Sequence, residues 1–334
     1  MAQIDFERKS RQMLEDYQLM LKRLNADKTE GLVEDRSDMS RFCYIKLKEL
    51  CRLDENEDVT LHGLMQEIFT ALHALGVIVS VVFLRKNGIL SVFAGADEKY
   101  IEDVRNAFNG ILPLVGFETE KNRFGAIHEK IYPSSVVLFS EKWSDGGFLK
   151  GNPAPSEGSV RLGLIEKVIK GMGKNDWIVS VFASPVPKTD TIAKKHLWLT
   201  RATDCSQLSE LSYMGNDMSV TTTYKKTYFH SEQYYQKILA FCEKGEESFS
   251  VGEWCVIVNF AAQGIKNARL LGGLLCAAYN SEKSQPESMH YMLQPQSSFC
   301  HLFNPMKYTH NDFCDYSYPL YGNYLTSREL GVVC

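Results

Sequence analysis

The stretch that decides the fold is Val77–Ala94, which reads VIVSVVFLRKNGILSVFA. Apolar and β-branched side chains fill both of its halves, as is typical of neighbouring β-strands. The Asn87-Gly88 pair between the halves is a preferred centre for a two-residue hairpin turn, because both residues adopt positive φ at little cost. The sequence therefore predicts two antiparallel strands, over 77–84 and 89–94.

The segments flanking this hairpin alternate between strand and helix patterns. Gly76 and Pro113 close two stretches with the apolar spacing of amphipathic helices. With the hairpin between them, the order β-α-β-β-α-β is that of the ferredoxin-like arrangement. The elements expected around the hairpin are a strand over 42–53, helices over 60–75 and 97–112, and a last strand near 115–118.

A second unit of the same kind follows. Between two of its strands lies a long insertion with helical patterns, which predicts an αα-hairpin over about 189–245, joined by the polar stretch 215–223. The expected elements are strand 126–139, helix 160–172, strand 177–184, helices 189–215 and 224–245, strand 251–262, helix 265–279 and strand 289–293.

The predicted fold class is therefore α/β (α+β), with tandem ferredoxin-like modules, mixed sheets and an N-terminal amphipathic helix over 3–26. That helix either packs on its own domain or docks as an arm on a neighbour. The predicted divisions are an arm and linker (1–36), a first module (37–125), a second module with its insertion (126–298) and an aromatic-rich tail (299–334).

Composition excludes several classes of protein. The chain has 334 residues, 44% of them hydrophobic, and a net charge of −4, which argues against a broadly basic surface that coats DNA. Its longest apolar run, Ala74–Leu84, is about half of the roughly 20 residues that a membrane span needs. Nine cysteines without repeated spacing favour free thiols in a reducing compartment. We expect a soluble, cytoplasmic protein without membrane partners.

Nucleotide-binding and catalytic motifs are incomplete or missing. The nearest approach to a phosphate-binding loop is Gly171-Met172-Gly173-Lys174-Asn175, which lacks the first glycine at the required spacing and the Ser or Thr after lysine. It also runs from a helix to a strand, so a helix C-cap explains it. No nucleophile, metalloprotease or kinase pattern is present, so no catalytic residue is assigned. We expect Cys255 to be a core thiol and His73 a surface or boundary residue.

A metal site is a weaker candidate. Cys300, His301, His310 and Cys314 lie close together in sequence, and zinc favours such ligands. Structural zinc sites usually space paired ligands by two to five residues, whereas Cys300 and His301 are adjacent. A tyrosine-rich loop with incidental cysteine and histidine accounts for the same pattern. A metal-dependent enzyme that uses these residues stays open as an alternative.

Candidate contact residues lie in the N-terminal helix and in the tail. Tyr17 and Leu21 belong to the apolar stripe of the helix, and Tyr316 and Tyr318 to a dense group of aromatic residues. Aromatic side chains at this density often mark a contact surface. A tail packed across its own domain is an equal alternative. Basic residues near the base of the insertion are more typical of a solvated helix face than of nucleic-acid contact. They are Lys194, Lys195, Arg201, Lys225 and Lys226.

Several segments together resemble a known family. They are Trp254–Phe260, Asn267–Tyr279, the turn Ser281–Pro286 and the closing sequence Tyr324-Leu325-Thr326-Ser327-Arg328-Glu329-Leu330. They are similar to the N-terminal region of bacterial HerA–FtsK-type P-loop ATPases, in which a similar Leu-Thr-Ser segment lies just before the motor domain. The stretches 162–184 and 108–117 also resemble that region.

The resemblance implies a non-catalytic module that shapes a ring and recruits a protein partner, such as an effector or a nuclease in phage defence or conjugation. It implies that ATP and magnesium bind a motor domain not present in this chain, and that DNA is contacted through that motor. No active-site residue of the family carries over. A stand-alone scaffold without a motor remains the main alternative.

Overall fold

The computed structural model describes residues 39–49, 61–112, 116–123, 127, 134–139, 164–217, 220–227, 239, 242–243, 245–279, 290–293 and 323–334. Its described residues fall into two compact units. The smaller unit comprises residues 187–250, and the larger one comprises the described residues from 39 to 186 and from 251 to 334.

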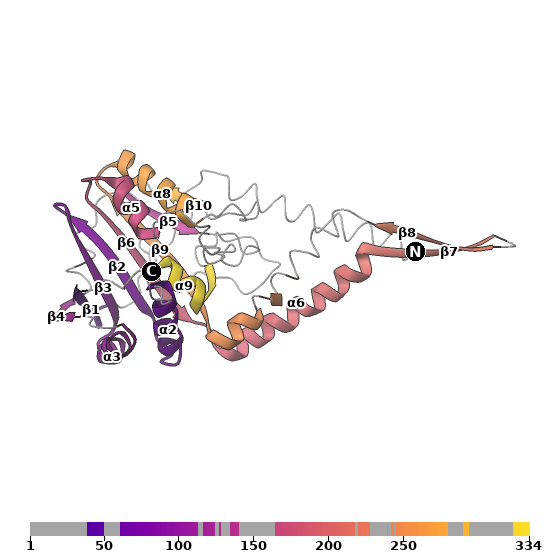
Figure 1. Ribbon diagram of the computed structural model, residues 1–334, viewed down its shortest axis with the longest axis horizontal. Helices are drawn as coiled ribbons and strands as arrows, with labels where there is room; N and C mark the ends of the chain where they lie inside the picture. Colours follow the sequence, from indigo (N-terminus) through magenta and orange to yellow (C-terminus); the bar gives the residue numbers. More distant parts are fainter. Residues whose placement is uncertain are drawn as a thin grey trace, which may run out of the picture. The chain divides into compact units, whose positions relative to one another are not determined.

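One nine-stranded sheet forms the larger unit (Figure 1). Its strands are β1 (Phe42–Glu49), β2 (Val79–Lys86), β3 (Ile89–Asp97), β4 (Gly116–Arg123), β5 (Ser134–Phe139), β6 (Trp177–Pro185), β9 (Glu253–Ala262), β10 (His290–Leu293) and β11 (Asn323–Thr326). They lie in the order β10-β5-β9-β6-β2-β3-β1-β4, and β11 also pairs with β9. Every described pairing is antiparallel, so the expected mixed sheets are wrong.

The first half of the sheet consists of β1 to β4 with the helices α2 (Leu61–His73) and α3 (Ile101–Ile111). Its central hairpin has the predicted turn, because Asn87 and Gly88 both have positive φ, 52° and 80°. Gly76, after α2, also has positive φ and ends that helix as expected. The first half is therefore built around the stretch that the sequence marks most clearly.

The second half repeats this order of elements. It consists of β5, β6, β9 and β10 with α5 (Leu164–Met172) and α8 (Ile265–Tyr279). Its strands lie in the order β10-β5-β9-β6, which matches β4-β1-β3-β2 of the first half position by position. The halves join where β2 and β6 pair antiparallel, with Val81 opposite Val181. The larger unit is thus an α+β fold with one continuous antiparallel sheet.

The main core lies between the sheet and its helices. Alternate residues of β6 and β9 face the helices, among them Val179 and Val258, and pack with Ile68 of α2 and Leu271 of α8. The remaining residues of these strands face the other side of the sheet, where Phe182 belongs to a second buried cluster. Burial on both faces explains why β6 and β9 read as continuous apolar runs instead of alternating ones.

The smaller unit differs from the expected αα-hairpin. The helix α6 (Lys188–Ser209) ends earlier than predicted, and β7 (Glu210–Asp217) and β8 (Val220–Thr227) form a two-stranded antiparallel sheet. The run Val220-Thr221-Thr222-Thr223 supplies the reason, because β-branched side chains lose rotamer freedom in a helix and favour strands. The returning chain is again helical at 245–251.

Helices in the described part of the chain fall short of what a membrane crossing needs, either in length or in apolar character.

Candidate functional site at the Trp254–Ser327 seam

The C-terminal segment is tied into the sheet beside β9. The strand β11 pairs antiparallel with the beginning of β9, with Leu325 opposite Trp254 and Thr326 opposite Glu253. The short helix α9 (Ser327–Val333) follows at once and packs against α2. We call this junction the seam; its residues are His73, Gly252, Glu253, Trp254, Thr326, Ser327 and Glu329. It brings together the stretches 254–260 and 324–330, which are far apart in sequence.

Trp254 and Ser327 form the centre of the seam. The indole Nε1 of Trp254 donates a hydrogen bond to Ser327 Oγ over 3.0 Å, and both residues are fully buried. Ser327 Oγ in turn donates to the carbonyl oxygen of Val251 over 2.6 Å, and the backbone amide of Ser327 donates to Gly252 over 3.0 Å. Because a backbone carbonyl accepts its proton, the Ser327 hydroxyl fixes the position of the Trp254 indole and is not activated as a nucleophile.

A capping box begins α9. The side chain of Thr326 accepts a hydrogen bond from the Glu329 amide over 3.2 Å, while the Glu329 carboxylate accepts one from the Thr326 amide over 2.8 Å. Both side chains are buried. The reciprocal bonds satisfy two backbone donors at the start of the helix and fix its direction relative to β11.

His73 links the seam to the first half of the sheet. It is the last residue of α2, and its Nε2 lies 2.9 Å from the carbonyl oxygen of Glu253. Its ring meets Trp254 edge to face, with the ring centroids 5.3 Å apart. The sequence suggests only a surface or boundary position; the structure makes His73 a half-buried contact residue, which only the pairing of distant segments reveals.

Gly252 permits the close approach of these parts. Its φ is +94°, and a Cβ atom on it would lie 2.7 Å from the His73 ring. Glycine is therefore required both by the backbone conformation and by the lack of space. The seam joins α2 of the first half, β9 of the second half and the C-terminal segment. Its contacts fix the orientation of these three parts relative to one another.

Two thiols near these elements are shielded from reaction. Cys255 in β9 is fully buried, as predicted for a core thiol. Burial raises the pKa of the Cys334 thiol, at the end of α9, well above its ordinary value. A thiol that stays protonated is a poor nucleophile, so Cys334 lacks the environment of a catalytic cysteine, while Cys255 is closed off from solvent by its burial.

The glycine-rich stretch around Lys174 forms the end of a helix. Gly173 follows α5 with φ +56°, and the Asn175 amide donates to the carbonyl oxygen of Met172 over 3.1 Å. The Asn175 side chain donates to the same carbonyl over 2.9 Å. This is the predicted helix C-cap, in which these contacts serve to end α5.

The metal and contact candidates from the sequence lie outside the described residues, whereas the basic residues near the base of the insertion lie in α6 and β8. The zinc candidates are Cys300, His301, His310 and Cys314, and the contact candidates are Tyr17, Leu21, Tyr316 and Tyr318. Within the described ranges, no group of three or more His, Cys, Asp or Glu side chains is placed to hold a metal ion. Neither the models of known protein families nor the curated proteins include a match to this chain.

Proposed function

We propose that this chain is a non-catalytic assembly and partner-recruiting module of a HerA–FtsK-type ATP-dependent DNA translocase, acting in the bacterial cytoplasm in phage defence or conjugation. The observation that carries the proposal is the seam. Trp254–Phe260 and Tyr324–Leu330 bear the resemblance, and they lie far apart in sequence yet pair as neighbouring strands. Because the two segments that resemble the family form one structure, we use them together as support for the proposal.

Mechanically, the seam suits a module that must present the following chain in a fixed direction. Strand pairing fixes the register of β11, the Trp254–Ser327 hydrogen bond fixes the start of α9, and the capping box fixes its axis. Buried hydrogen bonds of this kind resist rearrangement, because breaking one leaves a buried donor unsatisfied. Force or movement at α9 would therefore be passed to β9 and to α2.

The proposal includes two ferredoxin-like modules. Each half has the connection order β-α-β-β-α-β, and each has the strand order 4-1-3-2 in its own numbering. In this proposal α6 and the β7–β8 hairpin are an insertion between the second and third strands of the second module. Such an insertion is a natural place for a partner-specific element, because it does not interrupt the sheet.

In this proposal, ATP and magnesium belong to a motor domain, and DNA is engaged through that motor. This chain contributes self-association into a ring and recruitment of an effector or nuclease. In this proposal its own residues hold and orient other parts of the assembly, and they carry out no chemical step.

Two measurements test the proposal. The purified 334-residue chain should not hydrolyse ATP above the rate of a protein-free blank, and Lys174→Ala should change nothing. The reading frame past codon 334, or the adjacent gene, should encode a G-x-x-x-x-G-K-[ST] motif. ATP turnover that Lys174→Ala abolishes would overturn the proposal, as would a stop codon with no motor gene beside it.

A further inference from the structure

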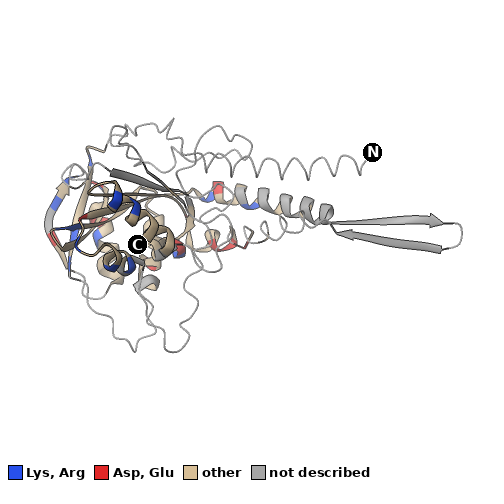
Figure 2. Cartoon of the chain, turned by 90° about the horizontal axis from the view of Figure 1, so that it is seen from above, with Lys and Arg blue, Asp and Glu red and all other residues tan. Residues whose placement is uncertain are grey.

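The helices of the second half present a cationic face. Four exposed cations lie on these helices: Lys167 and Lys170 on α5, and Lys266 and Arg269 on α8. The sequences of the two helices contain a single acidic residue, Glu166. The two helices pack side by side, since a Cβ atom on Gly171 would lie 2.6 Å from the Leu274 side chain. Figure 1 shows them together over one part of the sheet, and Figure 2 shows Lys and Arg across the described chain from above.

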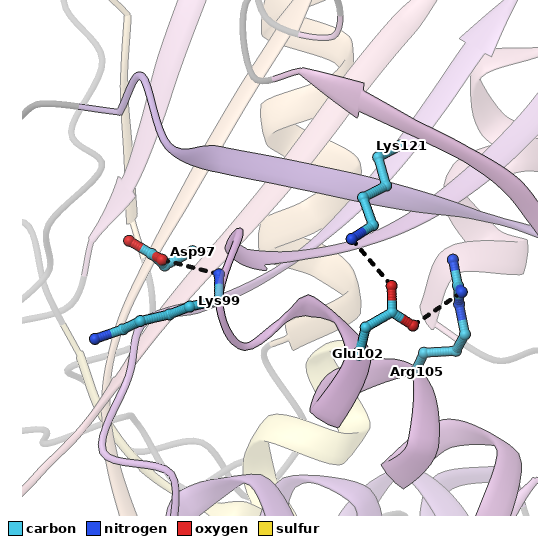
Figure 3. A network of polar contacts seen from close by, with 5 residues as sticks. All are labelled: Asp97, Lys99, Glu102, Arg105 and Lys121. Atoms are coloured by element: carbon cyan, nitrogen blue, oxygen red, sulfur yellow. Dashed lines mark hydrogen bonds and ion pairs between the residues drawn. The ribbon is translucent and has the colours of Figure 1, made fainter.

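These four cations have no acidic partner among the described residues. The first half is different, because several of its cations form ion pairs, two of which Figure 3 shows. Its exposed Lys48, Lys86 and Lys99 form none within the described ranges. Arg105 and Lys121 both contact the carboxylate of Glu102, at 2.9 and 3.0 Å, and Lys46 contacts Glu118 at 3.0 Å. The positive charges of Arg105 and Lys121 beside α3 are thus neutralised, whereas those on α5 and α8 are left unpaired.

The first half instead carries unpaired negative charge. Glu67 of α2, Asp103 of α3 and Glu98 just before α3 are exposed, and within the described ranges none of them forms an ion pair. Together α2 and α3 carry three carboxylates, those of Glu67, Glu102 and Asp103, and one cation, Arg105. The exposed positions of α2 one turn after Glu67 are Thr70 and Ala71, so small side chains lie beside its carboxylate on the helix surface.

Exposed aliphatic residues accompany the cations. Leu270 on α8 is 43% exposed and Ile265 at its start is 57% exposed. A phosphate backbone offers nothing that would bury such side chains, whereas a protein surface with small apolar residues does. The combination of unpaired cations and aliphatic side chains therefore favours a protein that presents carboxylates.

We propose that the cationic α5–α8 face binds the acidic α2–α3 face of a second copy of this chain. Both faces belong to the helical layer on one side of the sheet, because α2, α3, α5 and α8 all pack on the same core cluster. A two-fold axis through that layer therefore makes both contacts at once, which gives a closed dimer. The inference rests on the assembly role proposed above, but it does not require the link to a motor.

The test uses charge reversal on each face of the full-length chain. One variant is Lys266→Glu with Arg269→Glu, and the other is Glu67→Lys with Asp103→Lys. The matched control is Lys48→Glu with Lys86→Glu, two exposed positions that strand alternation places on the opposite side of the sheet from the helices. Circular dichroism and thermal unfolding establish that all variants fold.

Sedimentation equilibrium in about 50 mM salt should show a dimer for the unmodified chain and the control, weakened in about 500 mM salt. Each face variant alone should dissociate at least about tenfold more readily. An equimolar mixture of the two variants should regain the dimer, since one then presents only acidic faces and the other only basic ones. The variant with all four reversals should regain it as well.

Three results would overturn the inference: a chain that stays monomeric at about 100 µM in low salt, variants that associate like the unmodified chain, or a mixture that stays dissociated. Binding of a duplex DNA oligonucleotide by a monomer, lost on Lys266→Glu with Arg269→Glu, would assign the face to nucleic acid and would also overturn it. Charge-dependent dimers from a gene without a motor would sustain this inference while ending the proposed function.

Discussion

The two halves of the sheet share one plan and differ in what they expose. Their strands follow the same order, and their helices cover the same side of the sheet. Yet the first half pairs the cations Arg105 and Lys121 beside α3 with a carboxylate, whereas the cations on α5 and α8 of the second half are unpaired. The second half also contains an insertion between β6 and β9. The apolar pattern fixes the plan, while the solvent-exposed positions are free to diverge.

Their contribution to the seam also differs. The first half supplies α2, whose His73 contacts the Glu253 carbonyl, whereas the second half supplies the strand β9 to which β11 is paired. Phe69 of α2 completes the contact with its ring against Trp254, at a centroid distance of 5.9 Å. The halves are thus linked at Trp254 as well as by the β2–β6 pairing.

Trp254→Ala should have the largest effect on this link. The substitution removes a fully buried indole that contacts both His73 and Phe69 and donates to Ser327. Large-to-small changes of this type cost about 3–5 kcal/mol. We expect urea unfolding to show a loss of that size, together with faster proteolysis near the C-terminus. A loss below about 1 kcal/mol would mean that the two halves are held together without the seam.

Gly252→Ala should come next, with Gly88→Ala as its control. Both glycines have positive φ, but a Cβ atom on Gly88 would meet nothing within 4 Å, whereas one on Gly252 would collide with the His73 ring. The turn variant should lose about 1 kcal/mol from backbone strain alone. The seam variant should lose about 2–4 kcal/mol, because strain and overpacking add. Equal losses in thermal unfolding experiments would show that His73 moves aside freely.

Much of this plan can be predicted from the sequence, where the signal is local. The hairpin is marked by Asn87-Gly88, α8 has the bounds that its apolar spacing predicts, and Gly173 ends α5 as expected. Each of these depends on interactions within a few residues, which is why they can be read from one chain. Strand ends shift by about two residues, since β2 begins at Val79 instead of Val77.

The seam could not be predicted in full, because its contacts join segments far apart in sequence. One local signal for it exists: Thr326-Ser327-Arg328-Glu329 is a capping-box pattern that announces α9. No comparable signal places His73 beside Gly252 or pairs β11 with β9. The β7–β8 hairpin is missed for another reason. Its threonines are polar, which is typical of a linker, but their β-branching favours strands.

Ser327→Ala should have a smaller effect than either change above. It removes the acceptor of the Trp254 indole and the donor to the carbonyl of Val251 while keeping the packing almost intact. A buried donor left unsatisfied costs about 1–3 kcal/mol. We expect a loss of unfolding free energy within that range in urea unfolding. The double variant Trp254→Phe with Ser327→Ala should lose less than the sum of the two single variants, because Trp254→Phe removes the donor that Ser327→Ala leaves unsatisfied. Additive losses in the double variant would show that the hydrogen bond contributes no coupling.

Glu102→Gln should have the smallest effect on stability, and it sharpens the contrast between the halves. Glu102 is shared by Arg105 and Lys121 on an exposed part of the first half (Figure 3). Exposed ion pairs contribute less than about 1 kcal/mol, and salt screens them. We expect the free energy of unfolding, measured in urea, to fall by less than that value in low salt. In about 1 M salt the difference from the unmodified chain should vanish. The same variant removes a carboxylate from the α2–α3 face, so the dimer proposed above should weaken more visibly than the fold. A large loss of stability with unchanged association would mean that the paired charges of the first half serve the core and not the surface.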